Sequence, residues 1–175
     1  MTVSDQISQL TGEWILDPSR STVSLATKSM GGLARVKGTF GQVTGGGTVS
    51  PAGTVTGSLT IATTSIDTKN ARRDKHLRSA SFFDSDSHPD LTFAAEDVKP
   101  SGQDVTVTGM LRIRGRARPL SFTGTAAVHG DGEAWLDAEV PINRADFGMT
   151  WNVLGMVSMS SAVTVHAVFA RIPAR

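Results

Sequence analysis

Apolar and polar residues alternate in short segments that recur along most of the chain. The apolar residues fall on one face in segments 105–113, 120–128, 136–142 and 163–169. Successive side chains of a strand point to opposite faces, so this period of two predicts half-buried β-strands. Turn-forming residues separate roughly eight or nine such segments, the spacing typical of an antiparallel barrel or sandwich. The chain is therefore expected to be all-β.

The stretch 65–93 interrupts this alternation. Residues 70–78 are rich in charge and contain one apolar anchor, Leu77. Two turns of helix are marginal in isolation, so a helix here must be held by tertiary contacts. We expect Phe82 and Phe83 to provide these contacts. The sequence therefore predicts a short helix near residues 70–78, placed over one end of the strands.

Length and composition restrict the class of protein. The 175 residues suit one domain with a core of its own. The chain has no cysteine, which excludes disulfides and thiolate metal sites. Its net charge of +1 argues against a general nucleic-acid binder. We expect residues 1–11 to be disordered or weakly ordered and residues 12–175 to form the single domain.

The N-terminal sequence MTVSDQISQLTGEW bears on the location of the protein. It contains neither the basic segment nor the apolar segment of a signal peptide. No apolar run approaches the ~20 residues that a membrane-spanning helix needs. We therefore expect a cytoplasmic protein.

The glycine run Gly45-Gly46-Gly47 is interpreted as a turn between strands. A phosphate-binding loop would need a Lys-Ser or Lys-Thr pair after the glycines and then a helix, and neither is present. Many strand positions elsewhere are Ala, Thr, Ser, Gly or Val. Such small side chains leave space inside a closed barrel, which favours a cavity over a filled core.

Several motifs occur in a specific order and spacing. They include RDKHL at 73–77, FFD at 82–84, HPDLTF at 88–93 and INRADFG at 142–148. With shorter matches over about residues 12–171, the chain resembles the YceI-like family of polyisoprenoid-binding proteins. The resemblance implies a closed, lipocalin-like antiparallel β-barrel of about eight strands around a long apolar tunnel. One departure is that segment 28–35 lacks a histidine usual in the family, which leaves the headgroup of the ligand undefined.

The resemblance also implies a function and a ligand. The expected ligand is an isoprenoid lipid, either a polyprenyl phosphate or an isoprenoid quinone, and no cofactor is required. The expected function is non-enzymatic binding, storage or transport of that lipid. Transient contact with a membrane surface and a homodimer are compatible with the family. The alternative function is a barrel with a filled interior that acts as an interaction or stress-response module and binds no lipid.

Arg73, Asp74 and His76 are the candidate contacts to the lipid headgroup. Arg73 is suited to donate charge-assisted hydrogen bonds to a phosphate or quinone oxygen. In the alternative interpretation, Arg73 and Asp74 fasten the short helix to neighbouring backbone, as buried Arg–Asp pairs often do. We expect residues 143–148 to brace the barrel internally.

A second basic group consists of Arg112, Arg114, Arg116 and Arg118. Together with the cations of residues 69–78, these arginines are a candidate basic rim that favours phosphate or an anionic lipid surface. The alternative is an ordinary solvated surface, because runs of surface charge are common.

Large apolar residues are the candidates for lining the tunnel. Methionine suits flexible apolar ligands because its side chain repacks easily. The candidates are Phe40, Leu59, Ile61, Leu77, Phe93, Phe122, Phe147, Met149, Trp151 and Met156.

No motif supports catalysis or a metal site. The acidic segment 84–95 would need Gly at its sixth position and Glu at its twelfth to form a calcium loop, and the chain has Pro89 and Ala95 there. The serines near His76 lack the nucleophile elbow of a hydrolase. We expect neither catalytic nor metal-binding residues.

Overall fold

The alternating segments form strands in the computed structural model, which describes residues 6–152 and 155–175. The strands are β1 (Gly12–Leu16), β2 (Thr22–Ser29), β3 (Ala34–Phe40), β4 (Val43–Val49), β5 (Val55–Ala62), β6 (Ile66–Asp67), β7 (Asp90–Ser101), β8 (Asp104–Ile113), β9 (Arg116–His129), β10 (Glu133–Asn143) and β11 (Val157–Arg171). The helical elements are the α-helix α2 (Ala71–Arg78) and the 3₁₀ turns η1 (Ser8–Leu10), η2 (Met30–Gly32), η3 (Thr63–Ser65) and η4 (Arg144–Phe147).

Eight of these strands close into a barrel. β1 pairs with both β4 and β11, and antiparallel ladders join the ring in the order β1-β4-β5-β7-β8-β9-β10-β11. Because the ring is closed, each of its strands has a hydrogen-bonded neighbour on both sides. No fully unpaired strand edge is therefore left to pair with another molecule and aggregate. The predicted closed antiparallel barrel of about eight strands is confirmed.

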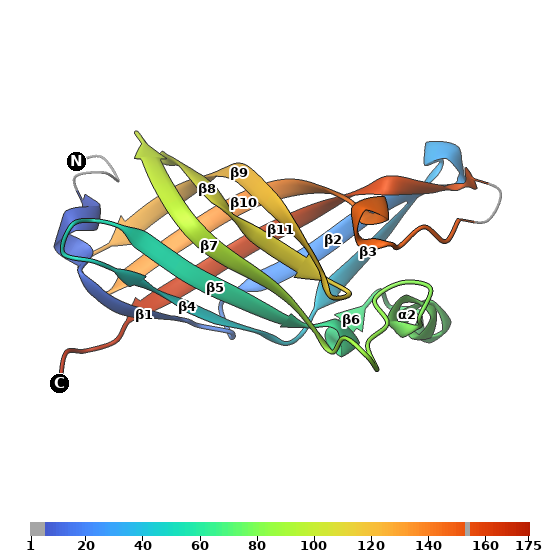
Figure 1. Cartoon of the computed structure of the whole chain (residues 1–175), viewed down its shortest axis with the longest axis horizontal. Coiled ribbons are helices and arrows are strands. Elements are labelled where there is room, and N and C mark those ends of the chain that lie inside the picture. Colours follow the sequence, from blue (N-terminus) through green and yellow to red (C-terminus); the bar gives the residue numbers. More distant parts are fainter. Residues whose placement is uncertain (1–5, 153–154) are drawn as a thin grey trace.

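The other three strands continue the same barrel walls. β11 pairs with β1 through residues 169–171 and with β2 through residues 157–166, so β1 and β2 lie end to end along one edge of β11. β3 pairs with β2 and β6, just as β4 pairs with β1 and β5. These extensions reach toward the end that carries α2 and η4, whereas η1 and the C-terminus lie at the opposite end (Figure 1).

The prediction of a turn at Gly45-Gly46-Gly47 is wrong, because these residues lie inside β4. A Cβ atom on Gly45 would lie 2.5 Å from the Ser58 carbonyl oxygen of β5. A Cβ atom on Gly47 would lie 2.7 Å from the Thr56 carbonyl oxygen of the same strand. The two backbones therefore approach so closely that only glycine fits at these positions.

The predicted helix near residues 70–78 is confirmed as α2. The side chain of Asn70 caps it by accepting a hydrogen bond from the Arg73 backbone N–H at 3.0 Å. Leu77 packs against the main hydrophobic core, in which Phe82 and Phe83 are buried. An eight-residue helix thus gains from docking the stability that it lacks alone.

The N-terminal residues fold onto the other end of the barrel. η1 brings Leu10 into a buried cluster with Trp14 and Val49, and Ile7 packs against this cluster. The described part of the segment that was expected to be weakly ordered therefore contributes to the core. Across residues 6–152 and 155–175, no helix has the length and apolar character needed to cross a membrane.

Candidate functional site

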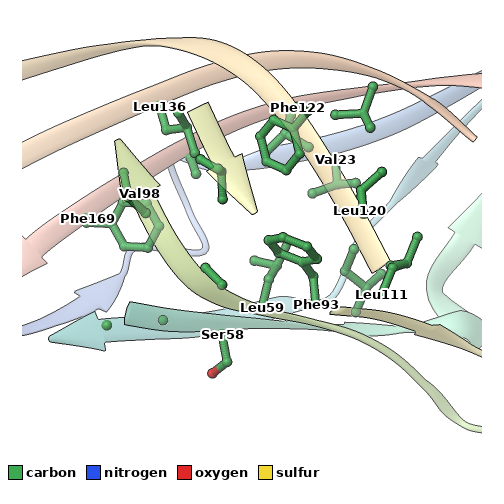
Figure 2. Close-up of a pocket in the computed structure, with 18 of the residues that line it drawn as sticks. Val23, Ser58, Leu59, Phe93, Val98, Leu111, Leu120, Phe122, Leu136 and Phe169 are labelled. Atoms are coloured by element: carbon green, nitrogen blue, oxygen red, sulfur yellow. The ribbon is translucent and has the colours of Figure 1, made fainter. Parts of the chain in front are cut away.

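A cavity of about 340 Å³ lies inside the barrel. Leu59 and Phe93 project into it from one wall, and Phe122 and Leu136 project from the opposite wall, whereas Ser58 points away (Figure 2). The volume falls within the range of small-molecule sites in proteins. Hydrocarbon side chains from both walls thus face one another across an unfilled space.

The cavity is elongated along the strands. Its lining residues on β11 run from Ser161 to Phe169, a span of about 26 Å in an extended strand. Leu10 and Trp14 line it at the η1 end, and Arg144 lines it at the α2 end. Arg144 is the only charged residue among the described residues of the lining. The cavity therefore has one apolar end and one end with a cation.

Small residues keep the interior open. Gly47, Gly57 and Ala95 are in register on the adjacent strands β4, β5 and β7, and all three line the cavity. Ala126 lines it from β9. A wall of glycine and alanine projects little into the barrel, so the opposing Phe and Leu side chains do not meet a matching layer. The small strand residues from which a cavity was predicted therefore include these positions.

The residues expected to line a tunnel divide into two groups. Leu77 and Phe147 pack in the hydrophobic core outside the cavity lining, and Trp151 and Met156 are exposed. The others line the cavity: Phe40, Leu59, Ile61, Phe93, Phe122 and Met149.

Many residues that line the cavity are absent from the predicted set. Their alternation with polar residues is the signal that identifies the inward face, but the choice of candidates favoured large side chains. The overlooked residues include Val23, Leu25, Leu120, Leu136, Val163 and Val165.

Arg73 and Asp74 fasten α2 to the turn that precedes it. Asp74 Oδ1 accepts hydrogen bonds from the Thr68 backbone N–H at 2.9 Å and the Thr68 hydroxyl at 2.6 Å. Arg73 Nε and Nη2 donate to the hydroxyl and carbonyl oxygens of Thr68, both at 2.9 Å. Asp74 is buried, so these bonds also offset the desolvation of its carboxylate.

His76 belongs to an aromatic cluster at the α2 end. Its ring meets Phe82 edge-on at 5.1 Å between centroids and meets Trp151 edge-on at 4.4 Å. The guanidinium of Arg144 lies over the Phe82 ring, 5.6 Å from its centroid. Phe82 therefore contacts both His76 and the charged residue of the cavity lining.

Arg144 is buried, with only 5% of its surface exposed. Its guanidinium donates to four carbonyl oxygens, those of Met149 at 2.6 Å, Trp151 at 2.8 Å, Ser158 at 2.9 Å and Val157 at 3.2 Å. No carboxylate among the described residues pairs with it. Burial lowers the pKa of Arg144 because the charged form loses hydration. The cation braces the segment between η4 and β11 and retains an uncompensated charge.

The arginines around the β8–β9 turn lie at the same end. Arg114 Nη1 donates to the Gly148 carbonyl oxygen at 2.6 Å, and Nη2 donates to that of Ala80 at 3.0 Å. Arg114 thus links the β8–β9 turn to the segments that follow η4 and α2. Within the described residues, Arg112, Arg114, Arg116 and Arg118 form no ion pair.

Two of these arginines share a face with the cavity lining. Arg116 pairs with Ile113 and Arg118 pairs with Leu111 across the β8–β9 ladder. Directly opposed residues of an antiparallel pair lie on one face, and both apolar partners line the cavity. Arg116 and Arg118 therefore continue the inner face of the barrel beyond its apolar part, where both are exposed.

The lining offers the chemistry of non-covalent binding to an apolar molecule with a polar end. Among residues 6–152 and 155–175, no group of three acidic or histidine side chains is arranged to hold a metal ion. Hydrocarbon side chains supply nearly all of the contact surface, and the cations gather at one end.

Comparisons with known proteins agree with this geometry. The family model described as the YceI-like domain matches residues 14–170. A UPF0312 protein of Pectobacterium carotovorum is 39% identical over 98 residues, which are 53% of this chain and 51% of that protein. The chain therefore spans about half the length of the curated relatives that it matches.

Solved structures share the fold. Burkholderia cenocepacia BcnA superimposes with a TM-score of 0.79 at 24% identity, over 87% of this chain and 98% of that chain. A polyisoprenoid binding domain from Saccharophagus degradans has a TM-score of 0.74 at 16% identity, over 91% of this chain and 98% of that domain. The family match over most of its length, on the barrel described above, shows that this chain belongs to the YceI-like family.

Proposed function

We propose that this protein binds an isoprenoid lipid in the cavity of its barrel and stores or carries it without catalysing a reaction. The observation that carries the proposal is the elongated apolar cavity with Arg144 as the one charged residue of its described lining. A prenyl chain presents only hydrocarbon along its length and thus matches this interior. Family membership adds support, since a structural relative is described as a polyisoprenoid binding domain.

The bilayer, rather than water, is the reference state for uptake of such a lipid. Burial of each methylene is worth about 0.8 kcal/mol against water. For a long prenyl chain the sum would exceed the ceiling of about 20 kcal/mol on non-covalent affinity. A lipid in a bilayer is already removed from water, so its transfer into the cavity changes the free energy little. Uptake is therefore reversible, and contacts to the headgroup set the balance.

The polar end of the lipid is assigned to the α2 end of the cavity. Arg144 lines the cavity there, and Arg116 and Arg118 continue the same inner face. Unpaired cations favour a phosphate headgroup over a neutral quinone. Arg73 and Asp74 contribute by holding α2 in place, because their polar atoms are bonded to Thr68.

An unfilled cavity favours lipid binding over the alternative of a filled barrel that serves as an interaction module. The cytoplasmic location and the homodimer stay predictions.

Mass spectrometry of an organic-solvent extract of the purified protein tests the proposal directly. We expect an isoprenoid in the extract, and saturable binding of a fluorescent prenyl phosphate by protein from which lipid has been removed. Absence of bound lipid together with absence of saturable binding would refute the proposal.

A pair of variants locates the binding site. Ala126→Phe places a ring in the cavity and should weaken prenyl phosphate binding by about tenfold or more. Thr125→Phe adds the same ring at the neighbouring exposed position and should leave binding unchanged. Equal binding by both variants would show that the lipid sits elsewhere.

A further inference from the structure

The hairpin that joins β2 to β3 ends in an exposed apolar tip. Leu33 is 90% exposed and Met30 is 53% exposed. Met156 is 42% exposed and precedes Val157, which pairs with Ser29 at the end of β2. The tip projects beyond the barrel at the α2 end, with η2 at its extremity (Figure 1). Single exposed apolar residues are ordinary, but here Met30 and Leu33 share one protruding turn.

The turn holds Met30 in an unusual backbone conformation. Met30 has φ of 53°, and Gly31 and Gly32 have φ of 65° and 94°. The left-handed region disfavours a residue with a long side chain, so glycine, Asn or Asp is the common choice. A methionine at this position is therefore unfavourable for the isolated hairpin.

Cations flank the apolar tip. Lys28 of β2 lies directly opposite Arg35 of β3, and Lys37 lies opposite Ala26 further along the same ladder. All three cations are exposed, and none forms an ion pair with the described residues. Like charges that face each other across a ladder repel. An anionic partner would relieve that repulsion.

We infer that the β2–β3 tip docks onto an anionic lipid bilayer. Leu33 and Met30 enter the headgroup region, where apolar side chains leave water, and Lys28 and Arg35 pair with lipid phosphates. The tip lies at the same end as the cationic end of the cavity, so docking brings that end toward the source of lipid. The inference goes beyond the proposed function, because docking needs no ligand in the cavity.

Vesicle co-sedimentation with lipid-free protein tests the inference. The probes are phosphatidylcholine vesicles with and without phosphatidylglycerol, at low and high salt. We expect binding to the anionic vesicles that weakens at high salt. Lys28→Gln and Arg35→Gln should each lower the partition coefficient by about fivefold. Leu33→Ser and Met30→Ser should lower it on anionic vesicles at both salt concentrations.

Control variants distinguish binding through the tip from non-specific binding of the protein to vesicles. Ile15→Ser removes an apolar residue of similar exposure, 53%, from β1, and Lys99→Gln removes an exposed cation from β7. Both should leave vesicle binding unchanged. Circular dichroism and thermal unfolding establish that each variant is folded.

Several outcomes overturn the inference. One is binding that the tip variants leave unchanged, and another is binding lost through Arg116→Gln and Arg118→Gln instead, which would place contact on the basic rim. Prenyl phosphate binding in detergent, measured on the same variants, distinguishes this failure from failure of the proposed function. Tip variants should retain that binding.

Discussion

The two ends of the barrel are closed by different kinds of interaction. At the η1 end, Leu10, Trp14 and Val49 form a buried apolar cluster, with one internal hydrogen bond from Trp14 Nε1 to the Leu10 carbonyl oxygen at 3.0 Å. At the α2 end, Arg144 and Asp74 hold irregular segments through hydrogen bonds to backbone and hydroxyl groups. The η1 end is closed by apolar contact, whereas the α2 end adds directional hydrogen bonds to the apolar packing of Phe82 and Phe83.

This difference explains why the two ends of the cavity differ in polarity. Apolar packing at one end stabilises the fold in proportion to the apolar area removed from water, but it supplies no favourable contact for a charged ligand group. Polar closure requires donors and acceptors at defined positions, and a buried cation left without a counterion is available to an anion. The cavity between the two ends therefore has a hydrocarbon end and a cationic end, as a lipid with a headgroup requires.

Trp14→Ala should have the largest effect and tests the apolar end. Loss of a buried indole should lower the free energy of unfolding by about 4 kcal/mol, through lost burial and the remaining cavity. Urea unfolding measures it. Trp151→Ala, at the exposed tryptophan of the aromatic cluster at the α2 end, is the control and should lower the free energy of unfolding by about 1 kcal/mol. A reversed order of the two effects would contradict the comparison.

Arg144→Met tests the polar end at its buried cation. The change leaves the four carbonyl acceptors without their donor and should lower the free energy of unfolding by about 3 kcal/mol. It should also weaken binding of a prenyl phosphate more than binding of the matching prenyl alcohol. Arg118→Met, at an exposed position, should change stability by about 0.5 kcal/mol or less. If the affinities for the phosphate and the alcohol fall equally, Arg144 does not contact the headgroup.

Asp74→Asn sharpens the comparison at the helix attachment. An amide lacks the charge that strengthens both bonds from Thr68, so the free energy of unfolding should fall by about 2 kcal/mol. Asp67→Asn, whose exposed carboxylate pairs with Lys69, should lower it by about 0.5 kcal/mol or less. Chemical denaturation measures both variants. If both variants lose the same free energy of unfolding, the buried hydrogen bonds of Asp74 stabilise the attachment of α2 no more than an exposed ion pair does.

Glu133→Gln should have the smallest effect and probes an ion pair on the outer surface of the η1 end. Hydrogen bonds from Arg20 and then Trp135 lower the pKa of Glu133 from 4.5 to about 2. Because its folded pKa is depressed, the carboxylate stabilises the fold above pH 4.5, and this contribution is lost as pH falls toward about 2. The deficit of the variant at neutral pH should therefore disappear over that range in urea titrations. A deficit that does not depend on pH would show that charge is not its cause.

The sequence carried more information about the wall of the barrel than about its ends. Alternation predicted the strands because a period of two is a local property, and Asn70 lies where a short helix needs its cap. The turn predicted at residues 45–47 is wrong because a close approach of two strands favours glycine just as a turn does. That approach depends on β5, which the local sequence around β4 does not reveal. Leu77 and Phe147 were assigned to the tunnel because size and hydrophobicity do not distinguish core from cavity lining.

The sequence by itself determined an all-β barrel of the YceI-like family with a short helix and small residues along its walls. Each of these follows from local patterning or from motifs at fixed spacing. Only the tertiary structure decided that Arg144 reaches the cavity and that Arg73 and Asp74 bond to Thr68. It also placed Arg116 and Arg118 on the inner face. The reason is that strand register and loop packing bring together residues that are far apart in the sequence, and the local pattern of side chains does not specify which of them meet.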